Sequence, residues 1–500
     1  MMKRAIILLA MFIALSFAAP QMSAVDCNID GIYYNLNKDK QTAKVTCHSF
    51  FKDPYKGAIV IPEYVVYENE TYTVTEISCA AFTNCSELIS VTIPRSIERI
   101  DQGAFKNCTK LSTVYFNAEN CKEMGMYMYP VFENCPKFSE LKFGDNVRSI
   151  PSSGFESCTG LKSIVLPDSL TYMGFGCFLN CTGLTSVTYG KKMTYTGYYA
   201  FDGCTNLKTV RLTNAIKGIT SNSFSGCISL SSISLPPGVT YIEQEAFSMC
   251  KALSTINIPD LVETIHECAF HGCSGLTNIN IPNSVTSIGG NAFSGCSGLT
   301  NVNIPNSVTS IGGSAFSGCS GLTRVYISNS VETIASETFK DCSSLATVTI
   351  PNSVTTIGRN AFYGTALTSI VLGSSVNKIE DYAFSTISSY ELDRVVCTAV
   401  APPLCGNRVF NKSSKARLFV PAESIERYKK ANVWSYFQII SDCSGVSDVG
   451  ADDAEVMYDV YDMRGVRVAG GLRETEANAE RLPRGVYILV SPQGRKKLKI

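Results

Sequence analysis

The stretch TNINIPNSVTSIGGNAFSGCSGL occupies residues 277–299 and is followed at once by a copy, residues 300–322, that differs at only two positions. Looser versions of its Ala-Phe-x-x-Cys-x-x-Leu segment recur along most of the chain, and their phenylalanine returns every 23 residues with few exceptions. The phenylalanines of this series are Phe82, Phe105, Phe132, Phe155, Phe178, Phe201, Phe224, Phe247, Phe270, Phe293, Phe316, Phe339, Phe362 and Phe384. A period of about 20 to 50 residues indicates a solenoid, in which each unit buries its apolar face against its neighbours. The sequence therefore predicts fourteen stacked coils rather than a compact enzyme fold.

Each coil is expected to contain one short strand. Asn278, Ile279, Asn280 and Ile281 alternate between polar and apolar side chains and precede Pro282, which is typical of a strand that ends there. Repeated in register, such strands form a parallel sheet with a spacing of about 4.8 Å. The rest of the coil is rich in Gly, Ser and Asn, which predicts turns and a short helical piece around Ala-Phe. The inward positions are those 3, 6, 9, 11, 15 and 18 residues after the phenylalanine.

Twelve of the 21 cysteines occupy the same repeat position, three residues after the phenylalanine. These are Cys85, Cys108, Cys135, Cys158, Cys181, Cys204, Cys227, Cys250, Cys273, Cys296, Cys319 and Cys342. In-register side chains point the same way and stay about 5 Å apart at Cβ, beyond the preferred disulfide separation, so we expect buried thiols that pack as small hydrophobes. Outside this ladder, Cys27 with Cys47 and Cys397 with Cys405 are plausible pairs, which the sequence alone does not assign.

Charge and composition argue against several functions. Lys plus Arg and Asp plus Glu both total 43, so no broad field favours nucleic acid as a partner. The chain has only three histidines, and the best cluster of reactive side chains runs from His266 through Cys268 and His271 to Cys273. Its histidines are five residues apart, which misses the helical spacing of a metalloprotease motif. We therefore expect no catalytic site, no metal and no cofactor.

The first residues have the order of a secretory signal. Lys3 and Arg4 precede an apolar run, residues 5–19, and small residues around Ala24 then predict cleavage after that residue. The run is short for a membrane span, and no later stretch approaches about 20 apolar residues. The sequence thus predicts a signal peptide at residues 1–24, an exported protein and no transmembrane span.

The repeat resembles a known family. Two motifs, Pro282-Asn283-Ser284-Val285 and Ala292-Phe293-Ser294-Gly295-Cys296, are similar to the BspA-type leucine-rich repeat of bacterial surface proteins. The resemblance implies a leucine-rich-repeat-like solenoid at residues 77–392, with a strand plus turns or a short helix in each coil of a parallel sheet. It also implies an amino-terminal β cap at residues 25–76 and a carboxy-terminal cap at residues 393–440, which shield the end coils from water.

The end of the chain has a different pattern. A polar linker is expected at residues 441–453, followed by a small all-β domain at residues 454–500. The segments Val460-Tyr461-Asp462-Met463-Arg464-Gly465 and Leu482-Pro483-Arg484-Gly485-Val486-Tyr487 resemble the sorting domain of the Bacteroidetes type IX secretion system. This resemblance implies passage across the outer membrane and attachment at the cell surface. The alternative is a small β module that merely ends the protein.

The candidate binding residues are the outward strand positions, 8 and 10 residues after each phenylalanine. Arg and Tyr are frequent anchors of interfaces, so the first candidates are Tyr115, Arg211, Arg324 and Tyr326, together with the Asn-rich strands at Asn278, Asn280, Asn301 and Asn303. The alternative is that Thr, Ser and Asn simply suit a solvent-facing strand. The family resemblance implies a non-enzymatic adhesin with extracellular, host-surface or bacterial protein partners, and glycan binding is the second hypothesis.

Overall fold

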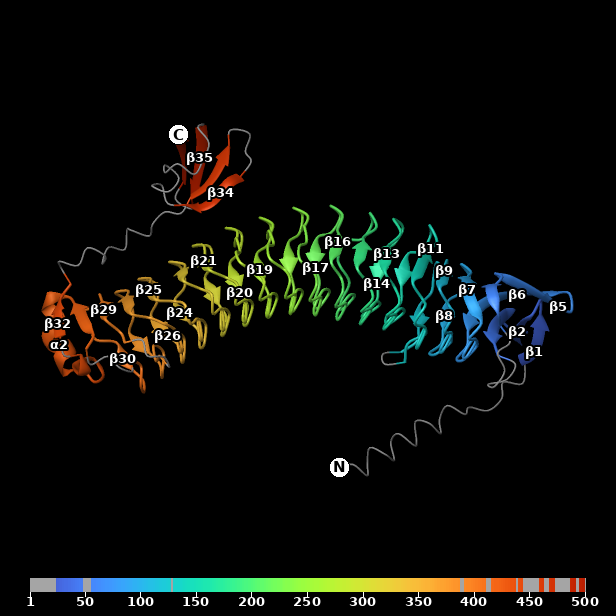
Figure 1. Cartoon of the computed structure of the whole chain (residues 1–500), viewed down its shortest axis with the longest axis horizontal. Coiled ribbons are helices and arrows are strands. Elements are labelled where there is room, and N and C mark those ends of the chain that lie inside the picture. The colour runs from blue at the N-terminus through green and yellow to red at the C-terminus, as the bar shows by residue number, and fades with distance from the viewer. Residues whose placement is uncertain are drawn as a thin grey trace, which may run out of the picture. The chain divides into compact units, whose positions relative to one another are not determined.

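Figure 1 shows the computed structural model of the chain. The structure describes residues 24–47, 55–126, 129–386, 391–410, 415–437 and 439–443, and the backbone of four strands between residues 458 and 499. The chain divides into two compact units, residues 1–177 and 178–500. The predicted signal peptide, apart from Ala24, and most of the predicted linker lie outside the described residues.

The amino-terminal cap of the first unit is a small sheet. Its strands are β1 (Ala24–Ile29), β2 (Ile32–Asn37), β3 (Thr42–Thr46), β5 (Tyr64–Tyr67) and β6 (Glu70–Ile77). The first three strands form an antiparallel meander, β3 pairs with β6 in parallel, and β5 pairs with β6 antiparallel. Alternate residues are buried in β2, among them Tyr34 and Leu36, so one face of this sheet covers the core.

The coils of the first unit contribute two sets of parallel strands. The first set is β4 (Gly57–Val60), β7 (Leu88–Ile93), β9 (Thr113–Phe116), β11 (Glu140–Phe143) and β13 (Ser163–Val165). The second set is β8 (Arg99–Ile100) with β10 (Glu123–Met124), and β12 (Ser149–Ile150) with β14 (Tyr172–Met173). We call the two sets the first and the second ladder. The second ladder was not predicted, because two residues are too few for alternation to be visible in the sequence.

The second unit repeats this arrangement (Figure 1). Its first ladder contains β15 (Ser186–Thr188), β16 (Thr209–Arg211), β21 (Asn301–Asn303), β23 (Arg324–Tyr326), β25 (Thr347–Ile350), β27 (Ser369–Leu372), β29 (Arg394–Cys397), β31 (Arg417–Val420) and β32 (Ile439–Asp442). Its second ladder contains β17 (Gly218–Ile219), β18 (Tyr241–Ile242), β19 (Thr264–Ile265), β20 (Ser287–Ile288), β22 (Ser310–Ile311), β24 (Thr333–Ile334), β26 (Thr356–Ile357), β28 (Lys378–Ile379) and β30 (Leu404–Cys405). The predicted parallel solenoid is therefore confirmed.

The segment around Ala-Phe consists of turns rather than the helical piece that the sequence predicts. Asn291 and Gly295, on either side of Phe293, have φ angles of 54° and 73°, which interrupt a helix. Backbone N–H groups donate to carbonyl groups of the next coil at 3.0 Å from Asn291, 2.8 Å from Phe293 and 2.7 Å from Gly295. The turns are thus hydrogen-bonded from coil to coil, and the described helices are all in residues 422–436.

The repeat phenylalanines form one row of stacked rings in each unit. From Phe178 to Phe410, neighbouring ring centroids are 5.2–6.0 Å apart and the rings are within 15° of parallel. From Phe82 to Phe155 the spacing is 4.7–5.8 Å. Phe410 stacks on Phe384 at 5.5 Å, so the row continues beyond the last phenylalanine of the sequence period. The sequence pattern missed this coil because Phe410 follows Val409 instead of Ala and has Ser413 at the position of the repeat cysteine.

The repeat cysteines are free thiols with a defined hydrogen bond. From Cys204 to Cys342, each repeat Sγ donates to the phenylalanine carbonyl of the preceding coil, as Cys296 does to Phe270 at 3.1 Å and Cys319 to Phe293 at 3.2 Å. Small size and a weak S–H donor explain why this buried position favours cysteine. The structure also has Cys27, Cys47, Cys397 and Cys405 as free thiols, in place of the pairs considered for the caps.

Aromatic residues close the far end of the second unit. Here η1 (Ala422–Ser424), α2 (Ile425–Lys430) and η2 (Trp434–Tyr436) follow β31. Trp434 is fully buried, donates from Nε1 to the Pro403 carbonyl at 2.9 Å and meets Phe410 edge-on at 5.4 Å. The Tyr428 hydroxyl lies 3.2 Å from Cys397 Sγ, which gives that thiol a partner other than Cys405.

The last four strands form a separate antiparallel sheet in the order β34, β33, β35, β36. Their bounds are β33 (Tyr458–Asp462), β34 (Arg467–Leu472), β35 (Val486–Ser491) and β36 (Gly494–Lys499). An all-β arrangement follows from the alternating strand and turn signals in this part of the sequence. The predicted linker begins later than residue 441, because β32 extends to Asp442.

Candidate interaction surface

Six of the predicted binding residues lie on three consecutive coils of the second unit. Strands β21 and β23 pair in parallel, so that Asn301 lies opposite Arg324 and Asn303 opposite Tyr326. The preceding coil contributes Asn278 and Asn280, and it is joined to the β21 coil by a Thr300 to Thr277 backbone hydrogen bond of 3.4 Å. We call Asn278, Asn280, Asn301, Asn303, Arg324 and Tyr326 the first-ladder patch.

The side chains of this patch project from a rigid base. Val302 and Val325 point inward and are 1% and 7% exposed, whereas Asn301, Asn303 and Arg324 are exposed and Tyr326 is half-buried. Among the described residues, no carboxylate lies within 4.0 Å of Arg324. A guanidinium without an internal partner keeps all its N–H donors for a ligand, and a neighbouring phenol adds flat apolar area.

The two other candidates lie elsewhere. Tyr115 belongs to the first unit, where Lys142 Nζ sits 5.2 Å from its ring centroid and also pairs with Glu140 at 3.1 Å. The Tyr115 ring therefore already has a cationic side chain of the protein against it. Arg211 on β16 lies five repeats before Tyr326, roughly 24 Å away at about 4.8 Å per strand. The structure therefore does not bring either residue into the first-ladder patch.

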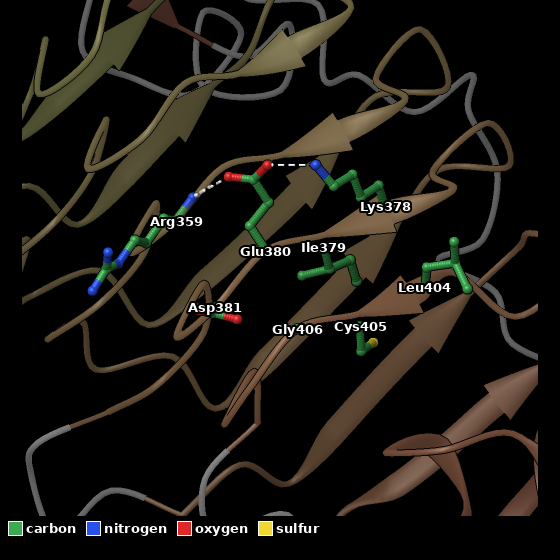
Figure 2. Close-up of a pocket in the computed structure, with 8 residues that line it drawn as sticks. All are labelled: Arg359, Lys378, Ile379, Glu380, Asp381, Leu404, Cys405 and Gly406. Carbon is green, nitrogen blue, oxygen red and sulfur yellow. Dashed lines mark hydrogen bonds and ion pairs between the residues drawn. The ribbon is translucent and has the colours of Figure 1, made fainter.

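A shallow pocket of about 390 Å³ lies on the second ladder near β28 and β30 (Figure 2). It is lined by Arg359, Lys378, Ile379, Glu380, Asp381, Leu404, Cys405 and Gly406. Glu380 accepts hydrogen bonds from the Arg359 backbone N–H at 3.2 Å and from Lys378 Nζ at 2.7 Å. The Arg359 guanidinium points away from this carboxylate (Figure 2). Sequence reasoning missed the pocket because its residues belong to the ladder that was not predicted.

The histidine cluster does not form a reactive centre. His266 is exposed in a turn, whereas Cys273 is fully buried, and burial raises the pKa of the Cys273 thiol to about 12. A protonated thiol is neither a nucleophile nor a metal ligand. His271 Nδ1 is buried and has no hydrogen-bond partner. Within the residues that the structure describes, no group of three or more His, Cys, Asp and Glu side chains is placed to hold a metal ion.

No helix in the described part of the chain is both long enough and apolar enough to cross a bilayer. A family model described as the BspA type leucine rich repeat region matches residues 69–183, 149–277 and 263–391. These segments together cover more than half of the chain, which therefore belongs to the BspA-type leucine-rich repeat family. The matched segments include the residues of the first-ladder patch.

Several solved leucine-rich repeat proteins are similar to this chain. A leucine-rich repeat protein of Bacteroides ovatus is 28% identical, and the match covers 83% of this chain and 98% of that one, with a TM-score of 0.61. A leucine-rich cell surface protein of Faecalibacterium prausnitzii is also 28% identical, over 76% and 95% of the two chains, with a TM-score of 0.46. The pneumococcal vaccine antigen PcpA is 15% identical, over 84% and 98%, with a TM-score of 0.33. The first of these supports the solenoid fold, and the search of the curated proteins gave no match.

Proposed function

We propose that this chain is a non-enzymatic interaction protein that binds extracellular or host-surface proteins through the first-ladder patch. The observation that carries the proposal is the in-register pairing of Asn301 with Arg324 and of Asn303 with Tyr326 on an exposed, rigid sheet. Arg and Tyr side chains contribute most often to the energy of protein interfaces. Membership of the BspA-type leucine-rich repeat family supports a binding role.

Biolayer interferometry of the full chain against immobilised matrix proteins tests this proposal. Replacing both Arg324 and Tyr326 by Ala removes the two anchors, and we expect at least about a tenfold loss of affinity. The matched control is Thr347→Ala with Thr349→Ala, which truncates the outward positions of the next coil on the same ladder. No binding to any matrix protein, or equal losses in the two double variants, would argue against the patch.

Glycan binding is the second candidate function. Asn280 pairs with Asn257 on the preceding coil, and Asn301 and Asn303 lie on the following one, so exposed amides form a short row. Amide groups both donate and accept hydrogen bonds, as sugar hydroxyl groups require. A glycan array probed with the full chain and with an Asn301→Ala, Asn303→Ala variant distinguishes the two functions. Sugar binding that this variant loses would favour the glycan reading.

Export and surface attachment complete the proposal. The order of charged, apolar and small residues in residues 1–24 supports secretion, and the motifs within residues 454–500 support a sorting domain. Protease shaving of intact cells that produce this protein tests surface exposure directly. Release of solenoid peptides from wild-type cells, but not from cells that express a chain truncated after residue 453, is the expected result. Equal release from both strains would exclude a sorting role for the last domain.

A further inference from the structure

A second group of aromatic side chains lies on the second ladder of the second unit. The outward residue of each strand there is Ser or Thr from β19 to β26, but earlier coils have Tyr195, Gly218 and Tyr241 at this position. Tyr195 is bridged to Gly218, and Gly218 pairs with Tyr241, so the three residues follow one another on adjacent coils. Strands β28 and β30 have Lys378 and Leu404 at this position, so along the described strands of this ladder in the second unit tyrosine occurs only at Tyr195 and Tyr241.

Tyr241 occupies the space that a side chain on Gly218 would fill. A Cβ atom on Gly218 would overlap ring atoms Cζ and Cε2 of Tyr241. The φ angle of Gly218 lies outside the left-handed region, so the backbone there does not require glycine. Glycine at this position instead lets the Tyr241 ring lie against the neighbouring coil, where the residue is half-buried.

A fixed carboxylate lies beside this ring. Glu243 Oε2 accepts hydrogen bonds from the backbone N–H and the hydroxyl of Ser221, both at 2.9 Å. Tyr198, whose side chain is 46% exposed, lies on the preceding coil next to Tyr199, whose backbone N–H donates to the Ser221 carbonyl at 3.0 Å. The charge of Glu243 raises the pKa of Tyr198 and, after burial, that of Tyr241, as expected for a carboxylate close to both phenols.

The acidic groups of this region lack cationic partners. Among the described residues, Glu243, Glu245 and Glu267 form no ion pair with Lys or Arg. Further along the same unit, Glu337 pairs with Lys340 at 3.2 Å and Glu380 pairs with Lys378 at 2.7 Å. The surface around Tyr198 and Tyr241 therefore presents unneutralised negative charge beside flat aromatic rings.

We propose that Tyr198, Tyr241 and Glu243 form a docking site for a Lys or Arg side chain of a basic protein segment. A cation over a tyrosine face is attracted by the ring quadrupole, and Arg also stacks its planar group on the ring. The Glu243 carboxylate, held by Ser221, supplies a charge-assisted acceptor at the edge of the rings. The site goes beyond the proposed function, because it uses the second ladder and none of the residues of the first-ladder patch.

Fluorescence anisotropy of a labelled peptide of alternating arginine and serine, titrated with the full chain, tests this site. Tyr198→Ala with Tyr241→Ala keeps every charge of the protein and is expected to weaken binding about tenfold, from two lost cation–π contacts. Glu243→Gln keeps both rings and is expected to weaken binding by a similar factor, more at low salt than at physiological salt. Tyr326→Ala, which removes a tyrosine from the first-ladder patch, is the matched control and should bind like wild type.

Gly218→Thr provides a second route to the same answer. Thr is a residue of the repeat at this position, as in Thr264, so the coil accepts it while its Cβ displaces the Tyr241 ring. We expect a loss of peptide affinity without a change in circular dichroism. Equal peptide binding by wild type, the double tyrosine variant and Gly218→Thr would overturn the site. The site would also be overturned if the double tyrosine variant lost binding to sugars on a glycan array but kept its affinity for the arginine peptide.

Discussion

Alkaline pH should unfold the solenoid of the second unit because its thiol ladder must stay protonated. Six ladder thiols have a pKa raised above the ordinary value of 9.0, with burial as the largest cause. They are Cys227, Cys250, Cys273, Cys296, Cys319 and Cys342. For Cys273 and Cys319 the raised pKa is about 12. Each Sγ donates to a phenylalanine carbonyl, a bond that a thiolate cannot make.

The sign follows from proton binding. Above the unfolded pKa of 9.0 the unfolded chain releases these protons while the folded chain keeps them, so the free energy of unfolding falls as pH rises. The stabilisation is complete below pH 9 and is lost between that value and the folded pKa. At about pH 10 each thiol costs about 1.4 kcal/mol relative to neutral pH, and six thiols together cost about 8 kcal/mol. A loss of this size is comparable with the whole stability of a typical domain, about 5–15 kcal/mol.

Urea unfolding followed by circular dichroism, at a series of pH values from neutral to alkaline and with a reductant present, measures this loss. The informative variant is Cys250→Ala, Cys273→Ala, Cys296→Ala. It should be less stable than wild type at neutral pH, because three buried side chains are truncated. It should lose about 4 kcal/mol less than wild type between neutral pH and about pH 10. Thr347→Ala, at an exposed position of the same unit that does not titrate, is the control and should follow the wild-type pH dependence.

Lysine and tyrosine side chains titrate in the same range, but they are shared by all variants and cancel in the comparison. A pH dependence that is the same in wild type and in the triple variant would refute the reasoning. It would mean that the buried thiols ionise in the folded state, or that other titrating groups cause the loss of stability at alkaline pH.

Other substitutions test the stack itself. Phe293→Ala removes a fully buried ring stacked on two neighbours and should cost about 3–5 kcal/mol in urea unfolding, whereas the exposed Thr347→Ala should stay within about 0.5 kcal/mol. Gly289→Ala should lower the thermal midpoint by several degrees, about 1–3 kcal/mol, because its Cβ would lie 2.5 Å from the Glu267 backbone nitrogen. Thr365→Cys restores the ladder residue and should change stability by less than about 1.5 kcal/mol; a larger loss would show that the Thr365 hydroxyl bond to the Phe362 carbonyl, at 2.8 Å, is required.

The period determines the core of the fold because each coil can bury its apolar side chains only against the next one. The six inward positions predicted from Phe293, which are Cys296, Leu299, Val302, Ile304, Val308 and Ile311, are at most 4% exposed. The spacing of apolar residues within one repeat was enough to predict these inward positions. Stacking in one dimension allows no other arrangement of such a pattern.

The turns were less predictable because their backbone conformation is not tied to one residue type. The position two residues before the phenylalanine has a positive φ angle in Cys268, Asn291, Ser314 and Glu337 alike. Asn suits this conformation, but the others adopt it because hydrogen bonds from coil to coil hold the turn in place. Similarly, the register placed Tyr115 on the outward face, but its contact with Lys142 depends on side-chain rotamers that the sequence does not specify.

The same rigidity explains where binding residues are to be sought. Most outward positions need only a small hydroxyl side chain, and some of these hydroxyls tie coils together, as Thr323 does by donating to the Thr300 carbonyl at 2.9 Å. A large side chain such as Tyr241 or Arg324 adds nothing to this coil-to-coil bonding. Because the register keeps each such side chain on a known ladder and coil, replacing it changes the surface without moving the core. Departures from Ser and Thr at outward positions are therefore the first residues to replace when the proposed interactions are tested.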